Sequence, residues 1–245
     1  MLDRDSNGEL LQERQVDDGQ GGKRGMKLAD FAHHRDAQLA KLSEAQVLAM
    51  RLYTTAVYKS INDPLRDRQR HQKNEPHPMP VLVHQLDKAI RKLRAVEAHG
   101  ATKSASIDLY RGLRNKQVQN KAPLPLGSGA LFSAHKPTAF LVWQVPAAFL
   151  PGGGAEFGPM STTHSLAVAM QYAASDASVI FRLRTDNCVM RGADVRFLSA
   201  FPHERECLFP PLTYLTPIVV NDVPVTQTVK VGHVTFEVVD VKPHF

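Results

Sequence analysis

The chain of 245 residues contains only two cysteines, Cys188 and Cys207, and no long apolar run. Two cysteines cannot form the disulfide framework of small extracellular domains, so the sequence fits a reducing compartment, with the cytoplasm as the favoured location. No segment approaches the roughly 20 apolar residues that a membrane-spanning helix needs. The opening residues, MLDRDSNGELLQERQVDD, have no apolar stretch behind a basic cluster, so no secretory signal is visible. We therefore expect no membrane partner.

Motifs for metal ions and for dehydrogenase-type nucleotide binding are also missing. The eleven histidines show neither an H-E-x-x-H pattern nor a Cys–His ligand spacing, so we expect no metal site. No G-x-G-x-x-G follows a predicted strand, so NAD would not be held as it is in dehydrogenases. The net charge of +6 indicates some affinity for acidic partners, but a solvated basic surface is the simpler explanation.

The order of the predicted elements begins with helices. Residues 1–26 are polar and glycine-rich, and we expect a disordered leader or linker there, followed by one domain over residues 27–245. Ser43 and Gln46 form a capping box before an amphipathic run that predicts a helix over residues 43–61, which Pro64 is expected to end. After a charged loop, DRQRHQKNEPHPMP, a second amphipathic helix is expected over residues 81–96.

Strand-like periodicity follows residue 100. In SIDLYRGL the alternation places Ile107, Leu109 and Arg111 on one face and Asp108 and Tyr110 on the other. Further runs, FLVWQV, VIFRLR, CLFPPLTYL and KVGHVTFEVVDV, are divided by turn-rich loops such as PGGGAEFGP and by a short helix, SLAVAMQYA. Helices first and strands later predict an α+β fold, with an N-terminal helical lobe followed by two packed, mainly antiparallel β-sheets.

Three short segments combine residue types that carry chemistry. LYRGLRN has Arg111 and Gly112 near the end of a predicted strand, and FGPMSTTHS has three hydroxyls at another strand end. In FLSAFPHERECLF, Glu204 and Glu206 stand two residues apart as the chain enters a strand. In extended backbone that spacing projects both carboxylates to one face, which suits a division of labour between paired acids.

The order of these motifs resembles that of the arginine-directed mono-ADP-ribosyltransferases. Aromatic–Arg–Gly, Ser–Thr–Ser/Thr and Glu–x–Glu follow one another as in clostridial actin-modifying toxins and eukaryotic members of the family. The resemblance covers roughly residues 43–245 and extends to YTTAVYKSINDPLR, GADVRFLS and LFPPLTYL. It implies an enzyme that releases nicotinamide from NAD and transfers ADP-ribose to an arginine of a protein acceptor. It also implies that NAD lies bent in a cleft between the two sheets, beside the helical lobe.

The resemblance also implies contacts with NAD. Arg111 would bind the diphosphate, a task that suits a forked cation able to reach two oxygens at once. The backbone at Gly112 would hold the nicotinamide amide, since glycine allows a close approach. Tyr172 would lie against the nicotinamide ring. The strand-end hydroxyls would orient a catalytic acid and hold the strand end, with Ser161 in the first role and Thr162 and Thr163 in the second.

The two acids would act on different partners. Cleavage of the N-glycosidic bond builds positive charge on the ribose, and Glu206 would stabilise that charge. Glu204 would orient and deprotonate the arginine nucleophile, because a guanidinium with a pKa above about 12 is a poor nucleophile. The preceding loop, FLSAFPHE, resembles the family's acceptor-docking loop, with Phe201 as its exposed contact.

Two other functions remain open at this stage. An NAD glycohydrolase would use water as the acceptor, and an inactive basic module would keep the fold and touch nucleic acid through Arg66, Arg68, Arg70 and Lys73. The intact set of three motifs argues against the inactive module, so nucleic acid is not the expected partner. Glu204 favours transfer over hydrolysis, because water needs no group that activates a guanidinium.

Overall fold

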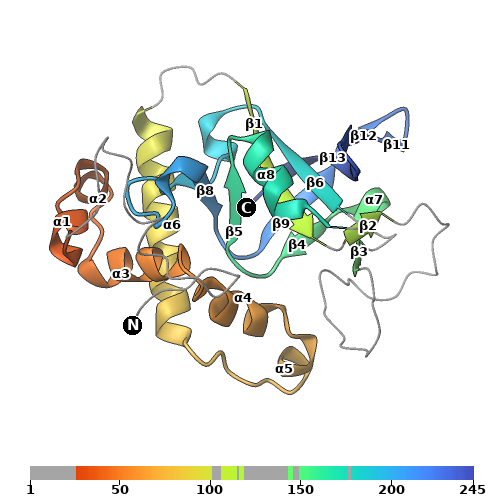
Figure 1. Cartoon of the computed structure of the whole chain (residues 1–245). Coiled ribbons are helices and arrows are strands. Elements are labelled where there is room, and N and C mark those ends of the chain that lie inside the picture. The colour runs from red at the N-terminus through yellow and green to blue at the C-terminus, as the bar shows by residue number, and fades with distance from the viewer. Residues whose placement is uncertain (1–25, 101–105, 115, 119–142, 146–148, 176–177) are drawn as a thin grey trace.

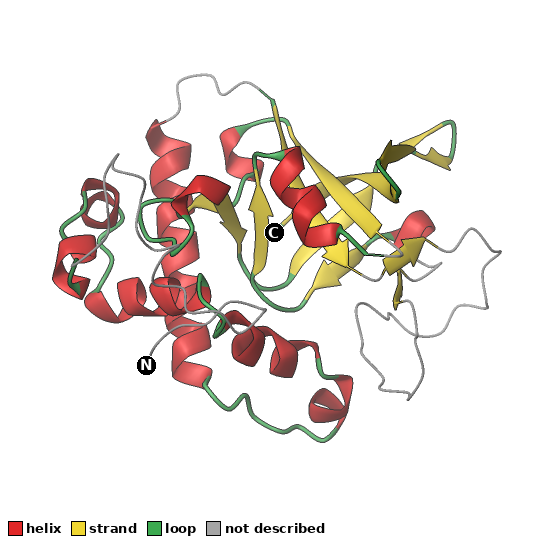
Figure 2. Ribbon diagram, in the orientation of Figure 1, coloured by secondary structure: helices red, strands yellow, loops and turns green. Residues whose placement is uncertain are grey.

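The computed structural model describes residues 26–100, 106–114, 116–118, 143–145, 149–175 and 178–245. Helices occupy the N-terminal part of the described chain and strands dominate the C-terminal part (Figure 2). The predicted α+β class is therefore confirmed. The leader expected over residues 1–26 lies, apart from residue 26, outside the described residues, as does the first half of the run FLVWQV.

The helical lobe gathers beside one end of the sheet, around the long helix α6 (Figure 1). Its helices are α1 (Leu28–Ala32), α2 (Arg35–Leu39), α3 (Glu44–Tyr53), α4 (Tyr58–Arg66), α5 (Arg68–Gln72) and α6 (Pro80–Gly100). The apolar face of α6 packs on α3, and Met50, Leu86 and Ile90 are all fully buried in the shared core. The predicted capping box is confirmed, because the Ser43 and Gln46 side chains each bond the other's backbone amide.

The first predicted helix is divided in two, and its expected end was wrong. The Thr54 and Thr55 hydroxyls donate to the carbonyls of Arg51 and Leu52, which competes with continued helical bonding and ends α3. Pro64 does not stop α4, which runs two residues further, to Arg66. The predicted loop after it contains the short helix α5, whose first amides are capped by the Asp67 carboxylate.

The strands form one continuous nine-stranded sheet, where two packed sheets were expected. Its path is β4-β9-β13-β6-β1-β5-β8-β7, with β12 paired to β13, and every pairing is antiparallel except that of β13 with β6. Strand β1 joins the two halves because it pairs along its length with β6 and at Tyr110 with Thr163 of β5. The bounds are β1 Ile107–Arg114, β4 Gly154–Glu156, β5 Met160–Thr163, β6 Ser178–Thr185, β7 Ala193–Asp194, β8 Glu206–Phe209, β9 Thr213–Pro217, β12 Thr226–Val231 and β13 Val234–His244.

Smaller elements complete the described chain. Two-stranded pairs are formed by β2 (Lys116–Val118) with β3 (Trp143–Val145) and by β10 (Val219–Val220) with β11 (Val223–Pro224). Helices α7 (Phe149–Gly152) and α8 (Leu166–Ala173) and the 3-10 turns η1 (Cys188–Met190) and η2 (Pro202–Glu204) lie between strands. Helix α8 covers one face of the sheet at β1 and β6 (Figure 1). This packing places the end of α8 next to the strand ends that carry the predicted site.

Candidate functional site

A buried carboxylate joins two arginines at the junction of the helical lobe and the sheet. Glu156 accepts from Arg66 Nε at 2.8 Å and from Arg111 Nη2 at 3.2 Å, and its side chain is 4% exposed. Arg111 also donates from Nη1 to the Ser161 carbonyl at 3.0 Å. Burial lowers the pKa of Arg111, and the Glu156 charge opposes that shift. The guanidinium groups of Arg66 and Arg111 are therefore held next to each other by the single negative charge of Glu156.

Sequence reasoning missed Glu156 because it treated PGGGAEFGP as a loop. Three consecutive glycines carry no strand propensity, but residues 154–156 pair with β9 and form the edge strand β4. The Gly158 amide then donates to Glu156 Oε1 at 3.2 Å. A lone acid between two glycine-rich turns was the only local signal, and its arginine partners lie 45 and 90 positions away.

The helical lobe contributes two tyrosines and an asparagine that were not predicted as site residues. The Tyr53 hydroxyl donates to the Pro159 carbonyl at 2.7 Å and accepts from Asn62 Nδ2 at 3.0 Å. Tyr58 is 39% exposed, and its ring meets that of Tyr53 edge-on at 6.4 Å. Tyr53 and Asn62 thus reach the chain just before β5, whereas Arg66 reaches Glu156 of β4. All three residues lie in YTTAVYKSINDPLR, and the resemblance of that segment to the family is the only sequence signal for them.

The hydroxyl run on β5 connects the neighbouring elements. Thr162 Oγ1 donates to the Cys207 carbonyl of β8 at 2.7 Å, and Thr163 Oγ1 donates to the Glu204 carbonyl at 2.5 Å. The Ser161 hydroxyl hydrogen-bonds the Glu206 carboxylate, whereas its carbonyl receives Arg111. One strand end therefore links the arginine and both acids.

Glu206 begins β8 and is 8% exposed. Burial raises the pKa of Glu206 to about 7, and hydrogen bonding by Ser161 and Ser199 opposes that shift only in part. The negative charge of Glu204 raises the pKa of Glu206 further. Close to neutral pH the group is thus poised between its two protonation states, which is common for acids in catalytic sites.

The expected extended geometry between the two acids was wrong. Glu204 ends the turn η2, and Arg205 adopts a left-handed conformation, with φ 49° and ψ 50°, before β8 starts at Glu206. The simple rule that alternate residues share a face therefore does not apply here. The carboxylates still interact electrostatically, and Glu204 Oε1 accepts from the Tyr172 hydroxyl of α8 at 2.6 Å.

Two further predicted residues have structural surroundings that differ from the expectation. Phe201 is partly buried at the start of η2, and its ring meets that of His203 edge-on at 6.3 Å. Gly112 faces the backbone of α8, where a Cβ atom would lie 2.1 Å from the Ala169 carbonyl oxygen. Close approach at Gly112 is therefore required by the packing of α8, whatever the glycine contributes to ligand binding.

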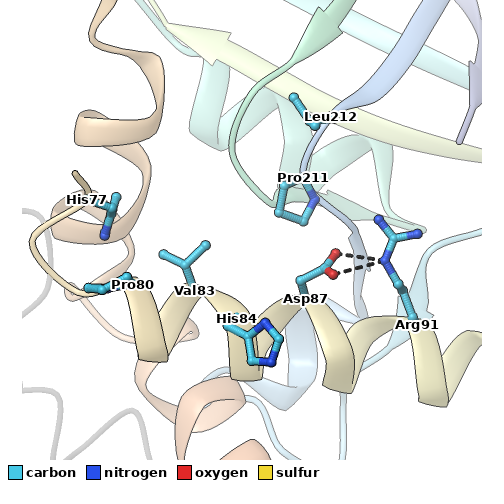
Figure 3. Close-up of a pocket in the computed structure, with 8 residues that line it drawn as sticks. All are labelled: His77, Pro80, Val83, His84, Asp87, Arg91, Pro211 and Leu212. Carbon is cyan, nitrogen blue, oxygen red and sulfur yellow. Dashed lines mark hydrogen bonds and ion pairs between the residues drawn. The ribbon is translucent and has the colours of Figure 1, made fainter. Parts of the chain in front are cut away.

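The site residues are distinct from the hollow shown in Figure 3. That hollow has a volume of about 370 Å³ and lies between α6 and the turn after β8, where Arg91 Nε donates to both oxygens of Asp87. Its lining residues are His77, Pro80, Val83, His84, Asp87, Arg91, Pro211 and Leu212, none of which belongs to the site. Across the described ranges no helix is long and apolar enough to cross a membrane, and no three His, Cys, Asp or Glu side chains are grouped to hold a metal ion.

Comparison with known proteins identifies the family. Residues 30–216 match the family model described as ADP-ribosyltransferase exoenzyme. The structure is similar to HopU1 of Pseudomonas syringae, with 14% identity, a TM-score of 0.56, and 100% of this chain and 91% of that chain covered. It is also similar to the toxin Plx2a of Paenibacillus larvae and to an ADP-ribosyltransferase of Clostridium botulinum, each with 16% identity, a TM-score of 0.53, and 89% of this chain and 96% of that chain covered. No curated protein sequence matches significantly. The family model spans most of the chain, and the protein therefore belongs to the ADP-ribosyltransferase exoenzyme family.

Proposed function

We propose that this protein transfers ADP-ribose from NAD to an arginine side chain of an acceptor protein and releases nicotinamide. The observation that carries the proposal is the convergence of Arg111, Ser161 and Glu206 on one strand end, with Glu204 beside them. Members of the family use NAD as their substrate, so a binding site for a dianionic diphosphate and a nearby acid are the features to expect.

The arginine pair supports binding of the diphosphate. Arg111 is oriented by Glu156 and by the Ser161 carbonyl, so its guanidinium has little freedom to lose when an anion binds. Arg66 Nη2 is buried and has no hydrogen-bond partner among the described residues. A buried N–H without a partner is costly, and a phosphate oxygen would satisfy it. Two cations and one carboxylate leave a net positive charge for the diphosphate.

Glu206 supports cleavage of the bond between nicotinamide and ribose. As that bond breaks, its electron pair leaves with nicotinamide and positive charge develops on the ribose. The ionised Glu206 carboxylate, held by Ser161 and Ser199 in a buried position, would stabilise this charge. The raised pKa does not oppose this role, because a cation forming nearby favours the ionised acid.

Glu204 supports attack by arginine. It is partly exposed at the end of η2, where an incoming side chain can reach it. A guanidinium nitrogen forms the new bond to the ribose carbon, and the proton that it loses passes to the Glu204 carboxylate. Phe201, partly exposed at the start of the same turn, would then contact the acceptor protein. No metal takes part in the proposed reaction.

The proposal is tested by measuring two products for each of two variants. Glu206→Gln should abolish both nicotinamide release and labelling of protein arginine, with a loss of at least about 100-fold expected for a preorganised charged group. Glu204→Gln should retain much of the NAD hydrolysis and nearly eliminate labelling. Free nicotinamide is measured by chromatography, and label is measured on an arginine-rich acceptor with the same preparations.

The outcomes separate the possible acceptors. Equal loss of both activities in Glu204→Gln would contradict the separate roles of the two acids. Retention of both activities would show that Glu204 is not the group that activates the arginine. Nicotinamide release by the unmodified protein without any labelling would identify water as the acceptor, and the proposal of arginine transfer would be wrong.

A further inference from the structure

Glu204 is held by two neighbouring elements. Its carbonyl accepts from the Thr163 hydroxyl on β5 at 2.5 Å, and its carboxylate accepts from the Tyr172 hydroxyl on α8 at 2.6 Å. Its own amide donates back to the Phe201 carbonyl at 3.0 Å. The first contact fixes the backbone of η2, whereas the second fixes the carboxylate. A glutamate at a turn has several free torsions, and the second contact restricts those that orient the Glu204 carboxylate.

The Tyr172 side chain is half-exposed, and its hydroxyl contacts Glu204. The residue is 52% exposed, although its hydroxyl makes the short bond to Glu204. Burial raises the pKa of Tyr172, and the charges of Glu204 and Glu206 and the tyrosine Tyr58 raise it further. The phenol therefore stays protonated near neutral pH and acts as a donor. Phenylalanine would keep the ring and remove only this donor.

We propose that the Tyr172 hydroxyl is a positioning group for the acceptor-activating acid, because it aims the Glu204 carboxylate at the site where the guanidinium binds. This inference rests on the proposed arginine transfer and adds the residue that determines how well an arginine acceptor competes with water. In this proposal the hydroxyl of Tyr172 has a role of its own, distinct from any contact that the ring makes with NAD.

Tyr172→Phe, assayed with the full chain, tests the inference. Agmatine, a small guanidine, serves as the acceptor, so that docking of a protein on η2 does not enter the result. We expect transfer to agmatine to fall about fivefold relative to NAD hydrolysis, as for loss of one hydrogen bond to a charged group with partial solvent access. The ratio is the readout, because a change in how the Tyr172 side chain contacts NAD would alter hydrolysis and transfer alike and would cancel in it.

Tyr214→Phe is the matched control. Tyr214 is 41% exposed, and its hydroxyl also donates a short hydrogen bond, in this case to the backbone carbonyl of Gly152 beside β4. Its loss should leave the ratio of transfer to hydrolysis unchanged. An unchanged or higher ratio in Tyr172→Phe would overturn the inference. A parallel loss of hydrolysis with a raised KM for NAD would also overturn it, since the residue would then act on NAD.

Thermal unfolding gives a readout that does not depend on activity. Tyr172→Phe, Glu204→Ala and the double variant form a cycle, because a glutamine at position 204 could still accept the bond whereas an alanine cannot. Each single variant removes the same contact, so its loss should be counted only once in the double variant. The contact is supported if the double variant has the same unfolding temperature as the less stable single variant. It is overturned if the two decreases in unfolding temperature add. If the unmodified protein fails to label agmatine, the arginine acceptor is wrong, and this cycle alone decides whether Tyr172 holds Glu204.

Discussion

Replacement of the buried acid Glu206 by glutamine should inactivate the enzyme and at the same time stabilise its fold. The pKa of Glu206 is raised from 4.5 to about 7 by burial, so the folded protein binds its proton more tightly than the unfolded chain does. Between these two values the folded state holds more protons, and stability falls as pH rises. The shift of about 2.5 units corresponds to about 3 kcal/mol at 1.36 kcal/mol per unit. Glutamine has the same shape and no charge to bury.

The free energy of unfolding of Glu206→Gln, measured in urea, should therefore exceed that of the unmodified protein by an amount that depends on pH. We expect a gain of about 1 kcal/mol at about pH 5 and about 3 kcal/mol at about pH 8, where ionisation of the buried acid is complete. The gain is an upper value, because the amide must find partners among Ser161 and Ser199. Glu44→Gln, at an exposed helix start, is the control and should show little change at either pH.

A gain that is equal at both pH values would refute the reasoning, since the effect would then come from packing and not from proton binding. Lower stability of the variant at about pH 8 would show that the Ser161 and Ser199 hydroxyls compensate the buried charge fully. The expected result would instead show that the site keeps an unfavourable charge for the sake of its chemistry, a known trade between stability and activity.

Two other substitutions test the arginine and the glycine of the same strand. Arg111→Lys keeps the charge but replaces two guanidinium nitrogens, which donate to Ser161 and Glu156, by a single ammonium nitrogen. NAD affinity in calorimetry should therefore fall by about 1–3 kcal/mol, and an unchanged affinity would remove Arg111 from the site. Gly112→Ala would push a Cβ atom to 2.1 Å from the Ala169 carbonyl oxygen and should lower the unfolding free energy by about 3 kcal/mol or more. Gly152→Ala, where a Cβ meets nothing within 4 Å, is its control, and similar losses in both variants would contradict the packing argument.

The fold class and the motif-bearing strands could be predicted because their signals are local. The capping box of Ser43 and Gln46 lies within one helical turn, and the alternation in SIDLYRGL lies within one strand. Both patterns reflect hydrogen bonds and burial between neighbours in the sequence, which short segments specify by themselves. The three motifs with Arg111, Ser161 and Glu206 could also be found locally, because each carries its own pattern of residue types.

Tertiary contacts decided what those local patterns could not. Glu156 lies in a glycine-rich stretch with no strand signal, and only pairing with β9 and two distant arginines gives it a place in the site. The left-handed Arg205 breaks the alternation on which the expected alignment of the two acids depended. The bond from Tyr172 to Glu204 joins residues 32 positions apart. Sequence by itself determined the types of the strongly periodic elements and the chemical groups of the site. The tertiary structure decided which charges are buried together, because burial and ion pairing depend on distances in space and not along the chain.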